Sequence, residues 1–162
     1  MAPRRSMSLR VAVVLATVVA IALGGWIFIR FAPGRHSGGD ASGGDPWAHH
    51  RGLVPFVVGS EAGLKASSAS GKPIAYFFTA TWCGWCTKLA EDSFSDTTIV
   101  EEMKRFTPVI VDGDAEPALM AKYGIEGFPA FVFVNQSLAP TAKILGYVPR
   151  DEFLTKLRQV PR

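Results

Sequence analysis

The only two cysteines of the chain stand two residues apart, in the segment TWCGWC at residues 81–86. An uninterrupted apolar run, IAYFFTA at residues 74–80, precedes them and predicts a buried β-strand. The segment TKLAEDSF, residues 87–94, follows them with apolar residues at helical spacing. The cysteines are therefore expected at a turn from a strand into a helix, which requires a fold that packs strands and helices in layers.

Three kinds of chemistry suit two cysteines at this spacing. A structural disulfide would close so short a loop that it would stabilise the fold by only about 2 kcal/mol. A zinc site would lack ligands, because structural zinc takes four and no further cysteine is present. A redox centre gains from the helix N-terminus, whose free amide donors and positive dipole end stabilise a thiolate. We therefore expect no metal, and a redox pair in which Cys83 attacks and Cys86 resolves.

The chain from residue 57 onward alternates short apolar runs with helical patterns, which predicts an α/β or α+β domain. Helices are predicted over residues 61–70, 116–124 and 149–160, and another is expected around a capping box of Thr98 and Glu101. Further strands are predicted at residues 108–112, 128–135 and 141–148.

Residues 11–29 form a run of 19 residues without a charge, long enough to span a bilayer as a helix. The arginines that precede it favour a cytoplasmic location for residues 1–10, so the remainder of the chain is expected outside the cytoplasm. This pattern indicates a single-pass signal anchor in a bacterial inner membrane, with the folded domain in the periplasm. Two alternatives remain open: a signal peptide cleaved near Ala20-Ile21-Ala22, which would give a secreted protein, and a twin-arginine signal at Arg4-Arg5.

Residues 30–56 are rich in glycine, serine and proline and are predicted to form a flexible tether, with the folded domain at residues 57–162. The tether contains His49 and His50, which suit either half of a metal site or a solvated pair. We favour the solvated pair.

The net charge of +3 arises around the apolar run. Four of the 17 basic residues flank that run, which leaves 13 basic against 14 acidic residues in the rest of the chain: the four are Arg4, Arg5, Arg10 and Arg30. No basic stripe interleaved with aromatic residues follows, so nucleic acid is not expected as a partner.

The segment WCGWC after an apolar strand, together with KYGIEGFPAFVF at residues 122–133, resembles the thioredoxin family. The resemblance extends from about Lys72 to Val160. It implies a thioredoxin-like α/β fold, a central mixed β-sheet flanked by helices, and dithiol exchange that needs no cofactor beyond the two sulfurs. The segment KLAEDSFSD, residues 88–96, is similar to the exported thioredoxin-like domains of membrane thiol:disulfide interchange proteins.

The resemblance also implies that the Phe128-Pro129 peptide bond is cis and that its loop lies across from Cys83. In the family this loop offers backbone groups to an extended substrate segment. The other expected substrate-binding residues surround the cysteines: Trp82, Gly84 and Trp85. The two tryptophans are expected to form an apolar lip, with core packing as their alternative role.

The sequence departs from the family at two positions. The usual buried aspartate of the central strand falls on Phe77, and the lysine often paired with it falls on or near Pro108. Deprotonation of Cys86 is then left to water or to another carboxylate. The candidates are Glu91, Asp112 and Asp114.

The dipeptide between the cysteines, Gly84-Trp85, carries no charge or histidine, which favours a reductant over a strong oxidant. The expected function is reduction of protein disulfides outside the cytoplasm, with electrons supplied by a membrane-embedded donor. Two alternatives remain: an oxidase or isomerase of secreted thiols, and a non-catalytic thioredoxin-like module that only binds partners.

Overall fold

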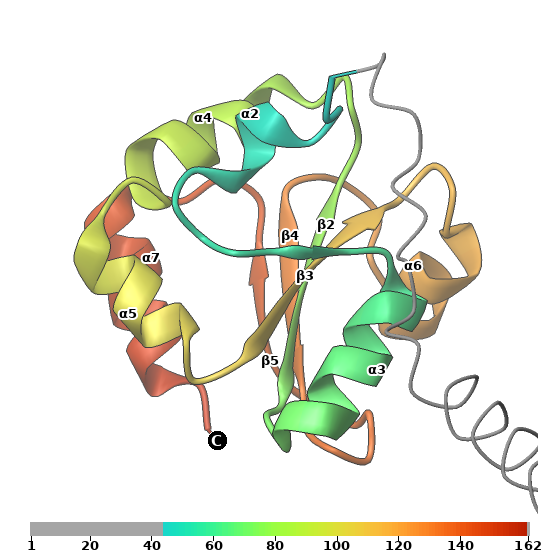
Figure 1. Cartoon of the computed structure of the whole chain (residues 1–162). Coiled ribbons are helices and arrows are strands. Elements are labelled where there is room, and N and C mark those ends of the chain that lie inside the picture. The colour runs from blue at the N-terminus through green and yellow to red at the C-terminus, as the bar shows by residue number, and fades with distance from the viewer. Residues whose placement is uncertain (1–43, 162) are drawn as a thin grey trace, which may run out of the picture. The chain divides into compact units, whose positions relative to one another are not determined.

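The computed structural model of the chain describes residues 44–161, whose strands form one mixed sheet (Figure 1). The strands are β1 (Val57–Val58), β2 (Ile74–Thr79), β3 (Thr107–Asp112), β4 (Ala130–Val134) and β5 (Pro140–Leu145). Their order is β1-β3-β2-β4-β5. The first three run parallel to one another, whereas β4 is antiparallel to both β2 and β5. The predicted central mixed β-sheet is confirmed.

Helices cover both faces of this sheet. They are α2 (Ala48–Arg51), α3 (Ser60–Ser70), α4 (Gly84–Ser93), α5 (Thr97–Met103), α6 (Pro117–Tyr123) and α7 (Arg150–Gln159). In Figure 1, α2, α4, α5 and α7 lie on one side of the sheet, and α3 and α6 lie on the other. Within the part of the chain that the structure describes, no helix has the length and apolar character needed to cross a membrane. The predicted span, residues 11–29, lies outside those residues.

The central strand β2 is buried along its whole length, because helices cover both of its faces. Its alternate side chains enter two separate cores. Phe77 belongs to the core under α4 and α7, where it stacks on Phe131 with 4.8 Å between ring centroids. Tyr76 and Phe78 belong to the opposite core and pack against Tyr123.

The predicted element boundaries hold at most positions, with two differences around the helices of the first face. Helix α4 begins at Gly84, inside the cysteine segment, and not after it. Helix α5 is capped by Asp96, whose carboxylate accepts hydrogen bonds from the backbone N–H groups of Thr98 and Ile99. The predicted capping box at Thr98 is therefore wrong, because Thr98 already lies within the helix.

In the structure the folded domain begins upstream of residue 57, the start predicted from the sequence. Trp47, His50, Val54 and Phe56 are all buried, so residues 45–56 pack into the domain and do not form a flexible tether. The solvated pair predicted at His49 and His50 is correct only for His49, since His50 is 2% exposed. Helix α2 belongs to this segment and strand β1 directly follows it; no sequence pattern predicted either element.

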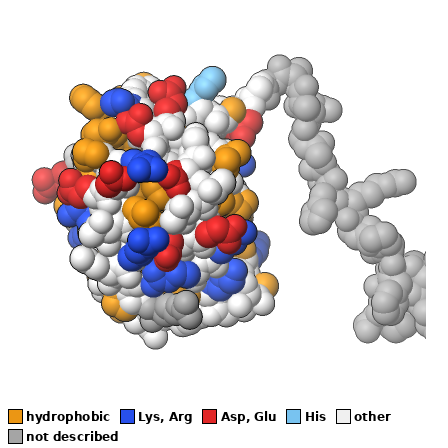
Figure 2. Space-filling view, turned by 90° about the vertical axis from the view of Figure 1, so that its left-hand side faces the viewer, with side chains coloured by type: hydrophobic (Ala, Val, Ile, Leu, Met, Phe, Trp, Pro, Cys, Tyr) orange, Lys and Arg blue, Asp and Glu red, His pale blue; other side chains and the backbone are white. Residues whose placement is uncertain are grey.

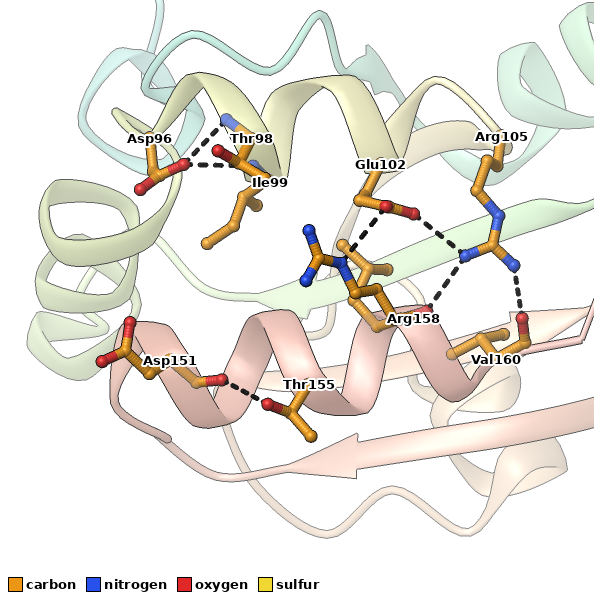
Figure 3. Close-up of polar contacts among 10 residues, drawn as sticks. Asp96, Thr98, Ile99, Glu102, Arg105, Asp151, Thr155, Arg158 and Val160 are labelled. Atoms are coloured by element: carbon orange, nitrogen blue, oxygen red, sulfur yellow. Dashed lines mark hydrogen bonds and ion pairs between the residues drawn. The ribbon is translucent and has the colours of Figure 1, made fainter.

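Charged side chains of both signs alternate over the face formed by α4, α5 and α7 (Figure 2). Many of them are paired, including Lys88 with Asp92 and Arg150 with Asp96. One pair is largely covered: Arg105, which follows α5, binds Glu102 within that helix. Arg105 also donates to the backbone carbonyls of Leu157 and Val160 at the end of α7, so it connects the two helices (Figure 3). This face therefore has no large field of a single sign.

Candidate active site

Three loops converge at one edge of the sheet because of how its central strands are paired. Strand β2 runs toward the cysteines, and its last residue, Thr79, is paired with Asp112 at the end of parallel strand β3. Strand β4 runs the opposite way, and its first residue, Ala130, is paired with Phe78. The cysteine loop, the loop after Asp112 and the loop before Ala130 therefore start or end at the same edge.

The two cysteines form a disulfide at the beginning of α4, with a Cα–Cα distance of 5.3 Å. Cys83 is the N-cap residue of this helix, and its Sγ accepts a hydrogen bond of 3.1 Å from the backbone N–H of Cys86. Cys83 retains 4% exposure, whereas Cys86 has none. The predicted strand-to-helix turn is confirmed, and the helix N-terminus offers donors to a thiolate on Cys83.

The two tryptophans beside the cysteines lie on the surface and not in the core, with 70% of Trp82 and 60% of Trp85 exposed. Trp82 donates from its indole Nε1 to Asp114, at 2.8 Å, and its ring packs edge-on against Phe128. Gly84, between them, is also exposed. Together they border the disulfide with apolar surface that is open to solvent.

Trp85 is supported by a residue that the sequence did not indicate. Its ring packs against Tyr147, at 5.4 Å between centroids, and the Tyr147 hydroxyl donates to Asp92. Lys88 forms an ion pair with the same carboxylate, and the hydrogen bonds from Lys88 and Tyr147 lower the pKa of Asp92. Tyr147 follows β5, far along the chain from the cysteines, so only the fold brings it here.

The peptide bond between Phe128 and Pro129 is cis, as the resemblance implied. Pro129 is buried and Phe128 is half-buried against Trp82, so this loop lies beside the cysteine loop. Gly113 lies directly under the Phe128 ring, where an added Cβ would come within 2.2 Å of a ring carbon. A hollow of about 260 Å³ adjoins the loop and is lined by Gly124, Glu126, Gly127, Phe128, Leu145 and Gly146.

No carboxylate occupies the position at which the family has its buried aspartate. Phe77 is fully buried there among aromatic rings, and Pro108 pairs with Ala75 in the sheet. Of the alternative carboxylates, Asp114 binds Trp82, and Asp112 accepts a hydrogen bond from the backbone N–H of Asp114. The third, Glu91, is exposed on α4.

A buried titratable side chain on this side of the sheet is His50. Its Nδ1 lies 3.1 Å from the hydroxyl oxygen of Thr79, and its Nε2 lies 3.1 Å from that of Thr87. Burial, and secondarily the charge of His49, lower the pKa of His50. Over residues 44–161 no three histidine, cysteine or acidic side chains are grouped as a metal site would require.

Comparison with known proteins identifies the kind of domain that carries these features. A family model described as a thioredoxin-like domain matches residues 61–161. Among solved structures, a thioredoxin from Thermus thermophilus has a TM-score of 0.57 at 27% identity and covers 64% of this chain and 85% of its own. The oxidised C-terminal domain of DsbD from Neisseria meningitidis has a TM-score of 0.52 at 25% identity, covering 62% and 91%.

Curated relatives are similar over the same region. The thiol:disulfide interchange protein DsbD of Campylobacter jejuni is 31% identical over 90 residues, which are 53% of this chain and 16% of that protein. The protein disulfide-isomerase erp38 of Neurospora crassa is 42% identical over 67 residues, 41% of this chain and 18% of that protein. The chain thus matches less than a fifth of the length of either relative.

Proposed function

This chain belongs to the thioredoxin family, and from that membership we propose that it is a thiol:disulfide oxidoreductase that reduces disulfides of other proteins through Cys83 and Cys86. The observation that carries the proposal is the disulfide at the N-terminus of α4, with Cys83 at the surface side and Cys86 buried beneath it. The exposed rings of Trp82 and Trp85 border this disulfide and suit an extended polypeptide with apolar side chains.

The reaction proceeds by two exchanges. The Cys83 thiolate attacks one sulfur of a substrate disulfide, so that a mixed disulfide forms and one substrate sulfur leaves as a thiolate. The Cys86 thiolate then attacks Cys83 Sγ, which releases the second substrate thiolate and closes the Cys83–Cys86 disulfide. Two electrons pass to the substrate, and its two thiolates take up protons from water. The cis peptide loop at Pro129 and the hollow beside it accommodate the substrate backbone next to Cys83.

The direction of electron flow and the location are further parts of the proposal. The dipeptide Gly84-Trp85 carries no charge that would stabilise the reduced form strongly, which supports a reductant. The apolar run at residues 11–29 supports anchoring in the inner membrane with the domain in the periplasm, where a membrane-embedded donor would re-reduce the pair. Two of the relatives above are named thiol:disulfide interchange protein and protein disulfide-isomerase, which supports exchange chemistry in either direction.

Trapping of the mixed disulfide tests the proposal. In Cys86→Ser the second exchange cannot occur, so we expect the full-length protein to accumulate disulfide-linked adducts with a scrambled or oxidised substrate protein, measured by non-reducing electrophoresis and mass spectrometry. Cys83→Ser, the matched control, should form at least tenfold fewer adducts, because Cys86 is fully buried. Equal trapping by both variants, or turnover that survives in Cys83→Ser, would contradict the roles assigned to the two cysteines, and no trapping by either variant would favour the binding module over the enzyme.

A further inference from the structure

The imidazole of His50 joins the two elements between which the redox pair lies. Thr79 is the last residue of β2, four residues before Cys83, and Thr87 directly follows Cys86 in the first turn of α4. Each hydroxyl lies 3.1 Å from a different ring nitrogen of His50. The connection Thr79–His50–Thr87 therefore spans the cysteine loop, residues 80–86, without passing through it.

A neutral imidazole fits this position. One of its nitrogens donates and the other accepts, and a threonine hydroxyl can do either, so both contacts are satisfied without a charge. The environment favours that form, since His50 is 2% exposed and burial lowers its pKa. Thr79 is also fully buried, on the same face of β2 as Phe77, so the contact to it is shielded from water.

The segment that carries His50 is fixed to the domain by several other contacts. Trp47 belongs to the same buried cluster as Cys83 and Cys86. The backbone N–H of Leu53 donates to the carbonyl of Phe94 at 2.8 Å. Gly52 has a φ of 51° and lies so close to Phe94 that an added Cβ would come within 2.6 Å of it, so only glycine suits this turn. The backbone that carries the imidazole is thus fixed by contacts other than the two hydrogen bonds of the ring.

We propose that His50 is a positioning residue of the redox site, which holds the end of β2 and the start of α4 at a fixed separation when the Cys83–Cys86 disulfide is open. The inference rests on the proposed function, because it concerns the reduced form of the same pair. In the oxidised form the disulfide itself closes the loop, so the connection through His50 is partly redundant. In the reduced form the hydrogen bonds of His50 still link the two ends of the cysteine loop, so their loss destabilises that form more.

A more unstable reduced form is oxidised more readily, so loss of the link makes the reduction potential more negative. The test equilibrates the full-length protein in detergent with glutathione buffers and measures the reduced fraction by thiol alkylation. For His50→Ala we expect the equilibrium constant for oxidation to rise about fivefold, which corresponds to about 20 mV for a two-electron couple. Thr87→Val, at a half-exposed position, removes the same link from the other side and should shift the potential in the same direction.

Two comparisons separate positioning from a general loss of stability. The double variant His50→Ala/Thr87→Val should shift the potential no further than one single variant, because both remove one link. His49→Ala, on the exposed neighbour, should leave the potential unchanged. Urea unfolding of the oxidised forms shows whether each variant folds, and Thr87→Val provides the test if His50→Ala does not.

A reversible couple in the wild type with unchanged potentials in His50→Ala and Thr87→Val would overturn this inference and leave the proposed function intact. Fully additive shifts in the double variant would overturn it as well. A wild-type protein with no reversible couple would overturn the proposed function, and the inference with it.

Discussion

The side chains that surround the disulfide depend on a glycine that carries no chemistry. Gly113 follows β3, and its missing side chain makes room for the Phe128 ring, which in turn packs against Trp82. A methyl group at this position would meet two ring carbons of Phe128 and the sulfur of Met120, each closer than 3.0 Å. The positions of the Pro129 loop and of Trp82 therefore both depend on the close contact between Gly113 and the Phe128 ring.

Gly113→Ala should therefore displace Phe128 and disturb the substrate surface. We expect the free energy of unfolding to fall by about 1–3 kcal/mol, the usual cost of overpacking, and KM for a protein disulfide to rise while the potential of the pair changes little. Gly44→Ala is the matched control, because an added Cβ there would meet nothing within 4 Å and Gly44 does not line the hollow beside the Pro129 loop. An unchanged KM in Gly113→Ala, or equal effects in both variants, would show that this contact does not position the loop.

The sequence predicted the reacting residues better than the residues that support them. The spacing of Cys83 and Cys86 at a strand-to-helix turn located the redox pair, and the family resemblance implied the loop at Pro129. His50, Asp114 and Tyr147 act on residues far away in sequence. For His50 the composition of the surrounding segment was misleading, because a segment rich in glycine and proline indicates a linker. Two aromatic residues of that segment, Trp47 and Phe56, are nevertheless buried in the domain.

At the level of elements, the helices that cover the cysteine side of the sheet are joined at their far end by Arg105. Arg105 follows α5; its guanidinium donates to Glu102 within that helix, and to the carbonyls of Leu157 and Val160 at the end of α7 (Figure 3). The last carbonyls of a helix lack the usual partner one turn ahead, and here the Leu157 carbonyl accepts from Arg105 as well as from the backbone N–H of Val160. The side chain of Arg105 is 17% exposed, which shields the interaction from solvent.

We expect Arg105→Ala to lower the free energy of unfolding by about 1.5–3 kcal/mol, the usual range for hydrogen bonds to a charged group, as measured by urea unfolding. Arg158→Ala is the matched control, because Arg158 contacts the same Glu102 but is 55% exposed. Its loss should cost less than about 1 kcal/mol. Equal losses in the two variants would mean that the carbonyl contacts at the end of α7 contribute nothing measurable.

Elements with strong patterns were predicted within a few residues, and short elements were missed. The apolar run of β2 and the glycine at the end of α3 gave unambiguous signals. Strand β1 has only two residues and α2 has four, so neither is long enough to show a periodicity. The start of α5 was misplaced because Asp96 and Thr98 both suit an N-cap, and only the backbone conformation distinguishes them.

At the scale of the whole molecule, the described domain combines a balanced surface with an apolar site. Opposite charges are interspersed over the face formed by α4, α5 and α7 (Figure 2). This face therefore does not attract a highly charged partner over a long distance. The exposed apolar side chains include Trp82, Trp85 and Leu145, and Leu145 lines the hollow beside the Pro129 loop. Such a site suits unfolded or extended segments, which present apolar side chains next to their disulfides.

The most direct test of the account is the reduction potential of the Cys83–Cys86 pair in the wild-type protein, equilibrated with glutathione and followed by thiol alkylation and tryptophan fluorescence. We expect a reversible two-electron couple near that of thioredoxin, about −270 mV. A potential near that of strong dithiol oxidants, about −120 mV, would contradict the proposed direction and indicate an oxidase or isomerase. No reversible couple at all would contradict the enzyme and leave a module that only binds its partners.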